Sequence, residues 1–183
     1  LHSTSRRQRQ MCIRDRMNTL EAARPNELDA CWEIIQEGRA FQNEQGFVQW
    51  TEDYPNRETL RQDIEEGKGF VLKVDGTIAA YMCVDFDGEP AYAAIQGRWE
   101  TEEPYAVVHR MAFAAAFRGR GLAADTFALI ERLCLSRGVR SLRADTDFPN
   151  LRMQHVLEKC GFVRRGVVIF QGSGKLAYDK TLA

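Results

Sequence analysis

Apolar residues along the chain follow two spacings, and these predict the order of helices and strands. In residues 26–41 they recur every three or four positions, the spacing of one helix face, and a second short helix is expected over residues 59–66. Two apolar runs at residues 70–74 and 77–84 are joined by an Asp-Gly pair, which is typical of a tight hairpin turn. We therefore expect two helices followed by two antiparallel strands.

The second half of the chain alternates strands with helices. The almost continuously apolar run 105–113 is typical of a central strand covered on both faces, and a helix face follows from residue 122 until Arg137 and Gly138 end it. The segment 85–103 is irregular, and is either a further hairpin arm or a loop over a pocket. The remaining expected elements are a parallel strand, a short helix and a closing strand pair, at residues 139–145, 151–159, 162–170 and 175–182.

The first sixteen residues differ from the rest, because RRQRQMCIRDR matches the translation of a widely used sequencing adapter. We expect residues 1–16 to be a non-native extension and residues 17–183 to form a single domain of the α/β class with a mixed (α+β) sheet. Without the extension the chain has 20 basic and 25 acidic residues, a formal charge of −5. Such an acidic domain gives no reason to expect a nucleic acid partner.

Five cysteines are scattered along the chain without a CxxC pair or a neighbouring histidine, which argues against a disulfide framework and against a metal site. No apolar run approaches the roughly 18 residues of a membrane span, and the opening residues lack the apolar centre of a secretory signal. We expect reduced thiols, no metal, no membrane partner and a cytoplasmic location.

A loop rich in glycine and arginine, residues 118–123, connects the central strand to the next helix. Its glycines allow backbone N–H groups to approach an anion, and the helix N-terminus adds about half a positive charge. Arg118 and Arg120 add full charges. The loop therefore predicts a ligand that carries a diphosphate.

Three kinds of phosphate-binding loop could give this segment its chemistry. No Gly-Lys-Ser/Thr follows the glycines, so the P-loop is excluded. The dinucleotide fingerprint stays open, because Gly119, Gly121 and Ala124 match GxGxxA and Asp145 ends a later strand about where a ribose-binding acid belongs. Against an NAD-binding protein, the loop lies deep in the chain and leaves too few residues for a second mononucleotide-binding half.

The third kind is an acetyltransferase loop, since Arg118-x-x-Gly121-x-Ala123 resembles the Arg/Gln-x-x-Gly-x-Gly/Ala pattern of the GNAT N-acetyltransferase family. Asn150 and the Gly161-Phe162 pair stand at the spacing of that family, and the order of elements after Met17 is the same. The resemblance implies the GNAT fold, a central mixed sheet flanked by helices, with acetyl-CoA as co-substrate. The residues it assigns to acetyl-CoA are Met111, Phe113, Arg118, Gly119, Arg120, Gly121, Leu122, Ala123 and Asn150.

The resemblance also implies that an amine of a small molecule or peptide attacks the thioester directly in a ternary complex. The amine must first lose a proton to a base whose pKa is near neutrality. His109 occupies the strand position where several family members carry a base, and is either that base or a structural histidine bonded to a neighbour. Where the family often has a tyrosine as general acid this chain has Leu157, and Tyr105 or Tyr92 are the candidate substitutes.

Four aromatic residues outside the expected core strands either line a substrate pocket or form a satellite core: Trp50, Tyr54, Tyr92 and Trp99. Two functions from different classes follow from the resemblance, an N-acetyltransferase and a non-catalytic acyl-CoA-binding sensor. A homodimer is common among proteins of the implied fold.

Overall fold

The computed structural model describes residues 18–183, so the adapter-like residues 1–16 lie outside the described range. Eight strands form one sheet: β1 (Asn18–Ala22), β2 (Gly69–Val74), β3 (Thr77–Asp85), β4 (Gln96–Gly97), β5 (Ala106–Phe113), β6 (Ser141–Asp147), β7 (Val163–Phe170) and β8 (Ser173–Thr181). The α-helices are α2 (Leu28–Glu44), α3 (Arg57–Glu65), α4 (Leu122–Ser136) and α5 (Leu151–Lys159), with short 3-10 helices η1 (Pro25–Glu27), η2 (Pro90–Ala94) and η3 (Ala115–Phe117).

The strands lie in the order β1-β2-β3-β5-β6-β8-β7-β4. Strands β5 and β6 are parallel, and every other neighbouring pair is antiparallel. This confirms the expected mixed sheet of the α/β class. The strand expected at residues 139–145 is β6, which begins two residues later than expected, and β8 lies between it and β7.

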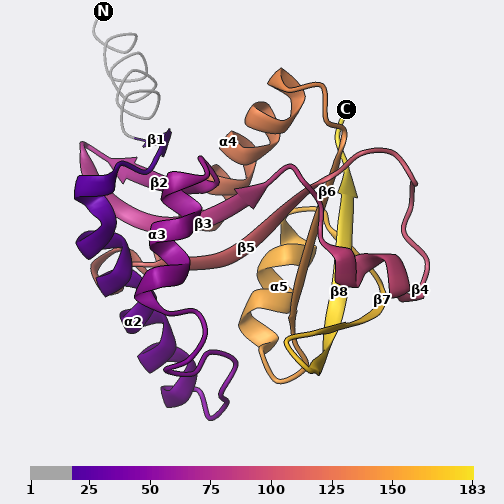
Figure 1. Cartoon of the computed structure of the whole chain (residues 1–183), viewed down its shortest axis with the longest axis horizontal. Helices are drawn as coiled ribbons and strands as arrows, with labels where there is room; N and C mark the ends of the chain where they lie inside the picture. Colours follow the sequence, from indigo (N-terminus) through magenta and orange to yellow (C-terminus); the bar gives the residue numbers. More distant parts are fainter. Residues whose placement is uncertain (1–17) are drawn as a thin grey trace, which may run out of the picture.

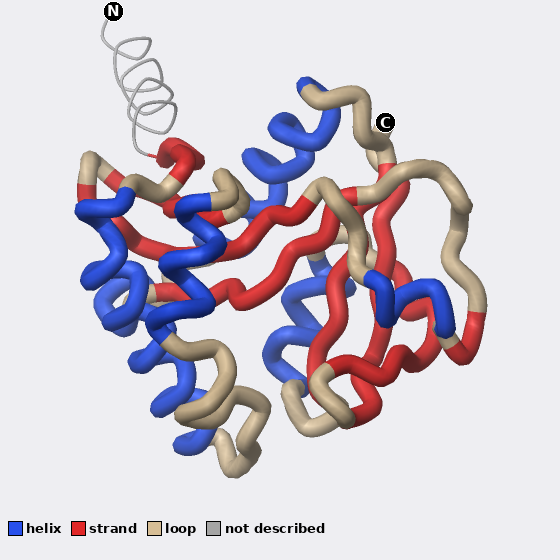
Figure 2. Tube along the Cα trace, in the orientation of Figure 1, coloured by secondary structure: helices blue, strands red, loops and turns tan. Residues whose placement is uncertain are grey.

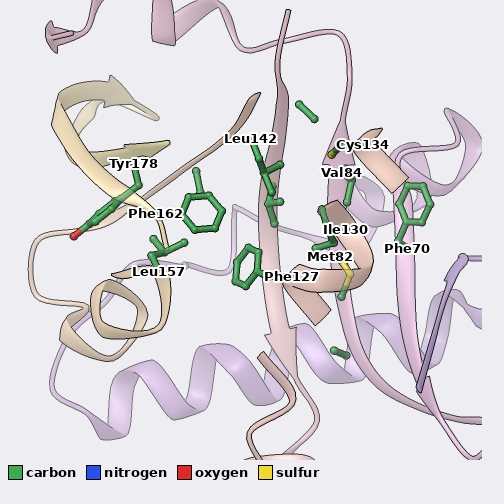
Figure 3. Packing of buried hydrophobic residues seen from close by; sticks show 14 of the residues in the cluster. Phe70, Met82, Val84, Phe127, Ile130, Cys134, Leu142, Leu157, Phe162 and Tyr178 are labelled. Carbon is green, nitrogen blue, oxygen red and sulfur yellow. The ribbon is translucent and has the colours of Figure 1, made fainter. Parts of the chain in front are cut away.

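The helices cover the two faces of the sheet in pairs (Figure 1). Helices α2 and α3 pack on the half formed by β1, β2, β3 and β5, in a cluster that includes Ile35, Leu60 and Tyr81. Helices α4 and α5 pack against the opposite face, where Phe127 of α4 and Leu157 of α5 lie in the largest cluster of buried apolar side chains (Figure 3). The missing family tyrosine is therefore replaced by a fully buried core residue.

The irregular segment between β3 and β5 folds as a loop over the second half of the sheet. It contains η2 and the two-residue strand β4, which pairs with β7. Tyr92 and Trp99 from this segment are buried with Val107, Val168 and Ala177 in a third apolar cluster. The segment is thus a loop that covers the sheet; it forms no hairpin, because β4 pairs with the distant strand β7, and none of its residues lines either of the two cavities described below.

Within residues 18–183, no helix is both long and apolar enough to cross a membrane. The same range contains no group of three or more histidine, cysteine, aspartate or glutamate side chains arranged to hold a metal ion.

Candidate functional site

The site begins where β5 and β6 separate. Their parallel pairing covers three residue pairs and ends at Val108 and Ala144; Figure 2 shows the two halves of the sheet diverging from this region. On the other edge of β5 the register with β3 shifts between Tyr81 and Cys83. Arg110 stands at this irregularity with a positive φ of 52°, a conformation unfavourable for a residue with a side chain. The short pairing leaves β5 without a β6 partner beyond Val108.

Arg110 is fixed in this conformation by a buried ion pair. Its Nη2 and Nε donate to the two carboxylate oxygens of Asp63 in α3, at 2.6 and 3.0 Å, and its Nη1 donates to the Tyr54 hydroxyl at 2.6 Å. Tyr81 donates a further hydrogen bond to Asp63 at 2.6 Å. Because one carboxylate binds the guanidinium with two parallel bonds, the side chain has a single well-defined position.

A first cavity, which we call the cofactor cavity, lies between the end of β5, the 118–123 loop and α5. The residues that the family resemblance assigns to acetyl-CoA all line it: Met111, Phe113, Arg118, Gly119, Arg120, Gly121, Leu122, Ala123 and Asn150. The fold therefore brings the 118–123 loop together with the end of β5 and with Asn150, which lies about thirty residues further along the chain.

The loop presents unpaired donors to this cavity. Gly119 and Gly121 have φ values of 75° and 72°, and a Cβ at either position would meet no atom within 4 Å, so open space lies above the loop. Helix α4 begins at Leu122 without a side-chain cap, which leaves its first N–H groups free of intrahelical partners. Arg118 lies over the Phe41 ring, with Cζ 4.2 Å from the centroid. Its buried Nη2 has no hydrogen-bond partner in the described chain. These groups fit the diphosphate of coenzyme A.

A second cavity, the acceptor cavity, adjoins the first. Five residues line both: Gln42, Trp50, Met111, Asn150 and Met153. The acceptor cavity is further lined by Tyr54 and His109, by Asp145 of the separated strand β6, and by Phe170 and Lys175 around the β7–β8 turn. The two cavities therefore adjoin in the region where β5 and β6 separate.

The four predicted pocket aromatics divide into two pairs. Trp50 lines both cavities and Tyr54 lines the acceptor cavity. Tyr92 and Trp99 line neither, because both are buried in the third apolar cluster, where the Trp99 indole donates to the Tyr92 carbonyl at 3.0 Å. Tyr92 and Trp99 therefore belong to a satellite core and not to the substrate pocket.

His109 lines the acceptor cavity with its ring stacked on Phe170, the ring centroids 5.6 Å apart. Its Nε2 lies 3.8 Å from a carboxylate oxygen of Glu89. Burial, together with the positive charges of Arg110 and Lys68, lowers the pKa of His109 to about 3. The expectation of an ordinary pKa near 6.5 is therefore not met: the imidazole is neutral at pH 7 and is a weak base.

The two tyrosines considered as substitute acids lie behind the site. Tyr92 donates its hydroxyl hydrogen to Asp145 at 2.6 Å, and the Tyr105 hydroxyl accepts from the Glu89 backbone N–H at 3.1 Å. Neither tyrosine lines either of the two cavities. Leu157, Tyr92 and Tyr105 therefore offer no proton donor to either cavity.

Sequence reasoning missed most of the polar residues of the acceptor cavity, among them Arg110, Gln49 and Lys175. Gln49 accepts a hydrogen bond from Asn150 at 2.9 Å, across 101 residues of chain. Lys175 forms an ion pair with Asp147, and Asp145 was considered only as a ribose-binding acid. No local pattern in the sequence marked Gln49 or Lys175.

The sequence model of the acetyltransferase (GNAT) family matches residues 30–162. A GNAT-family acetyltransferase from Streptococcus agalactiae is 36% identical, with a TM-score of 0.82 over 91% of this chain and 96% of that one. A GNAT-family acetyltransferase from Listeria monocytogenes is 20% identical, with a TM-score of 0.72 over 90% and 95%.

An aminoglycoside acetyltransferase solved in complex with coenzyme A shares the fold, at 19% identity and a TM-score of 0.66 over 90% of this chain and 94% of that one. A search of curated proteins finds no match. The family match includes the 118–123 loop, so it decides between the acetyltransferase loop and the dinucleotide fingerprint in favour of the former.

Proposed function

Because the chain belongs to the GNAT acetyltransferase family, we propose that it transfers an acetyl group from acetyl-CoA to a primary amine of a small molecule or peptide. The observation that carries the proposal is that the cofactor and acceptor cavities adjoin and share five lining residues. An enzyme that joins two substrates directly needs adjoining sites, because its gain in rate comes from holding the reacting atoms together.

Different residues of the chain bind different parts of acetyl-CoA. Arg118 and the free N–H groups at the start of α4 bind the diphosphate. The backbone of β5 beyond Val108 has no β6 partner, so its polar groups are available to a pantetheine arm lying along Met111 and Phe113. Bound acetyl-CoA supplies a thioester carbonyl that an amine nitrogen can attack. Asn150, which lines both cavities, stands at their junction.

A structure of the same fold contains ribostamycin together with coenzyme A, which supports a small-molecule amine as the acceptor. The identity between that chain and this one is 18%. The acceptor is therefore proposed by chemical class alone.

The test is release of the coenzyme A thiol from acetyl-CoA across a panel of primary amines. We expect acceleration by at least one amine class, and an increase of about tenfold or more in KM for acetyl-CoA in Arg118→Ala, since a charge-assisted hydrogen bond is worth about 1.5–3 kcal/mol. Arg132→Ala is the matched control, because Arg132 is exposed on α4, the helix that follows the loop, and lines neither cavity.

The outcome also separates the two functions that the sequence left open. Binding of acetyl-CoA that depends on Arg118, without any amine accelerating thiol release, would support a non-catalytic acyl-CoA sensor instead of an enzyme. Equal effects of Arg118→Ala and Arg132→Ala would contradict the diphosphate site itself.

A further inference from the structure

Asp145 stands at the point where the two parallel strands separate. It is the first residue of β6 beyond the last pair with β5, and it lines the acceptor cavity. The Tyr92 hydroxyl donates to Oδ2 at 2.6 Å, while Oδ1 makes no hydrogen bond within residues 18–183. One oxygen is thus held by a fully buried tyrosine, and the other is left for a ligand.

The charges around the acceptor cavity leave this carboxylate without a cation. Two cationic side chains line the cavity, and each has its own carboxylate: Arg110 is paired with Asp63 and Lys175 with Asp147. Asp145 forms no ion pair within 4 Å with any residue in the described part of the chain. A partly buried carboxylate without an ion-pair partner is costly, so the cavity favours a ligand that brings a positive charge.

We propose that Asp145 is the catalytic carboxylate of the acceptor cavity, binding the acceptor amine and taking up the proton that its nitrogen loses. Tyr92 is then a positioning residue, because it fixes the carboxylate through Oδ2 and does not itself line the cavity. This inference rests on the proposed acetyl transfer and names the group that activates the acceptor.

The acceptor enters the cavity as an ammonium ion. Asp145 accepts one proton from nitrogen and passes it to solvent, which leaves a neutral amine. The nitrogen lone pair forms the C–N bond, the C–S bond breaks, and its electron pair stays on sulfur. Asp145 takes the second proton from nitrogen, and the thiolate gains one proton, from Asp145 or through solvent, so the products are an amide and a thiol.

Acid–base properties within the cavity support Asp145 over His109. Burial raises the pKa of Asp145 to about 6; the Tyr92 hydrogen bond and the charge of Lys175 oppose this rise, and the charges of Glu89 and Asp147 add to it. At pH 7 the carboxylate is ionised and close to the pKa at which a base is most effective. The His109 imidazole, with a pKa of about 3, takes up a proton far less readily.

The experiment measures kcat and kcat/KM from pH 5 to 9 with one fixed amine, so that the ionisation of the acceptor is the same for every variant. The wild type is expected to lose activity below about pH 6. Asp145→Asn, which keeps an oxygen for Tyr92, is expected to lose about 10²–10⁴-fold in kcat, the usual contribution of a general base. His109→Gln should keep the limb near pH 6.

Tyr92→Phe tests the positioning role by a readout that a purely structural role would not move. Removal of the hydrogen bond that lowers the pKa of Asp145 should shift the acidic limb to higher pH. Glu131→Gln is the control carboxylate, since Glu131 pairs with Lys180 on the other face of the sheet and lines neither cavity. Thermal stabilisation by coenzyme A in each variant establishes that it is folded.

Each other result overturns the assignment. An Asp145→Asn variant with unchanged kcat and an unchanged acidic limb, or with only a raised KM for the amine, removes Asp145 from proton transfer. Loss of the limb in His109→Gln but not in Asp145→Asn assigns the base to His109. A wild type that no amine accelerates overturns the proposed function, and this inference with it.

Discussion

At the scale of single residues, the position of Arg110 depends on one carboxylate. The side chains of Arg110 and Asp63 are 12% and 8% exposed, so neither charge is stabilised by bulk water. Loss of one partner from a buried pair leaves the other charge uncompensated, which is more costly than the loss of the bond itself. The pair also fixes the bulge of β5 from which the site opens.

Asp63→Ala is therefore expected to lower the free energy of unfolding by about 3–5 kcal/mol, measured by urea denaturation. The double variant Asp63→Ala with Arg110→Met should recover part of this loss, because no buried charge remains. As a control, Glu58→Gln removes the exposed partner of Arg61 on the same helix and should leave the urea midpoint almost unchanged. A similar loss in both single variants would argue against the buried charge as the cause.

Because of His109, we expect the free energy of unfolding to fall in acid. Its pKa is about 3 in the folded protein and near 6.5 when unfolded, so the unfolded state binds more protons as the pH falls below 6.5. The stability is present above that pH and is lost towards pH 3. Between pH 7 and pH 5 this amounts to about 2 kcal/mol.

His109→Gln should remove that dependence, which urea unfolding at the two pH values would reveal. Asp145 contributes with the opposite sign, since its raised pKa makes the folded protein more stable as the pH falls through 6. Both proteins contain Asp145, so the difference between them isolates His109. If the free energy of unfolding changes between pH 7 and pH 5 by the same amount in the variant as in the wild type, His109 is protonated in the folded protein.

The sequence reveals site residues only where the chemistry is local. Arg118 and Gly121 could be identified because loop, helix start and charges occupy one short segment. Tyr92 and Asp145 meet across 53 residues of chain, and the lowered pKa of His109 arises from burial that no neighbour in the sequence indicates. Tertiary packing determines both features, so periodicity and motif spacing could not predict them.

At the scale of elements, α4 begins and ends with a glycine in the same conformation. Gly121 and Gly138 both have a φ of 72°, and a Cβ at either would meet nothing within 4 Å. Replacement by alanine therefore introduces the same backbone strain at both ends, about 1–2 kcal/mol. The two positions differ because Gly121 lines the cofactor cavity, at the opposite end of the helix from Gly138.

We expect Gly121→Ala and Gly138→Ala to lower the free energy of unfolding by similar amounts, and only Gly121→Ala to weaken coenzyme A binding in a titration. The added methyl group would occupy the space above the loop into which the diphosphate must fit. Equal affinities for coenzyme A in the two variants would contradict the location of the diphosphate.

The start of α5 combines a structural and a binding residue. The Asn150 side chain accepts a hydrogen bond from the Met153 N–H at 3.1 Å, as a helix cap, and donates to Gln49. Asn150→Ala should lower the free energy of unfolding by about 1 kcal/mol, whereas Asn150→Asp keeps a good cap and should stay close to the wild type. Urea unfolding of both variants tests this, and a large loss in the aspartate variant would mean that the bond to Gln49 matters more than the cap.

Helices and hairpins could be predicted from the sequence more closely than strand order. Helix α5 has the bounds expected for it, and the Asp-Gly turn joins β2 and β3 as expected. Strand β1 was missed because five residues of mixed polarity show no alternation, and α2 extends three residues beyond the expected end. The insertion of β8 between β6 and β7 depends on pairings of distant residues, on which local periodicity has no bearing.

At the scale of the molecule, the two halves of the sheet are joined at β5 and β6 by only three residue pairs. The cofactor cavity takes residues from both sides of this junction, with Met111 and Phe113 on β5 and Arg152 and Met153 on α5. A ligand bound there contacts both halves, and therefore stabilises the arrangement of one relative to the other.

Coenzyme A at about 100 times its Kd should stabilise the protein by about 2.7 kcal/mol and raise Tm by roughly 5–10 °C. Hydrogen exchange should slow at the 118–123 loop and at the start of α5 together, with little change in β1. Protection confined to the loop would show that the ligand does not connect the two halves.

The two cavities are lined in part by different segments of the chain, so the specificity for each substrate can change separately. The acceptor cavity is lined by Phe170 and Lys175 on either side of the β7–β8 turn and by Tyr54 before α3. None of these residues lines the cofactor cavity. Turns tolerate exchange better than the elements they connect. Substitutions there can therefore change which amine is accepted while the recognition of the acyl donor, encoded around α4, is inherited unaltered.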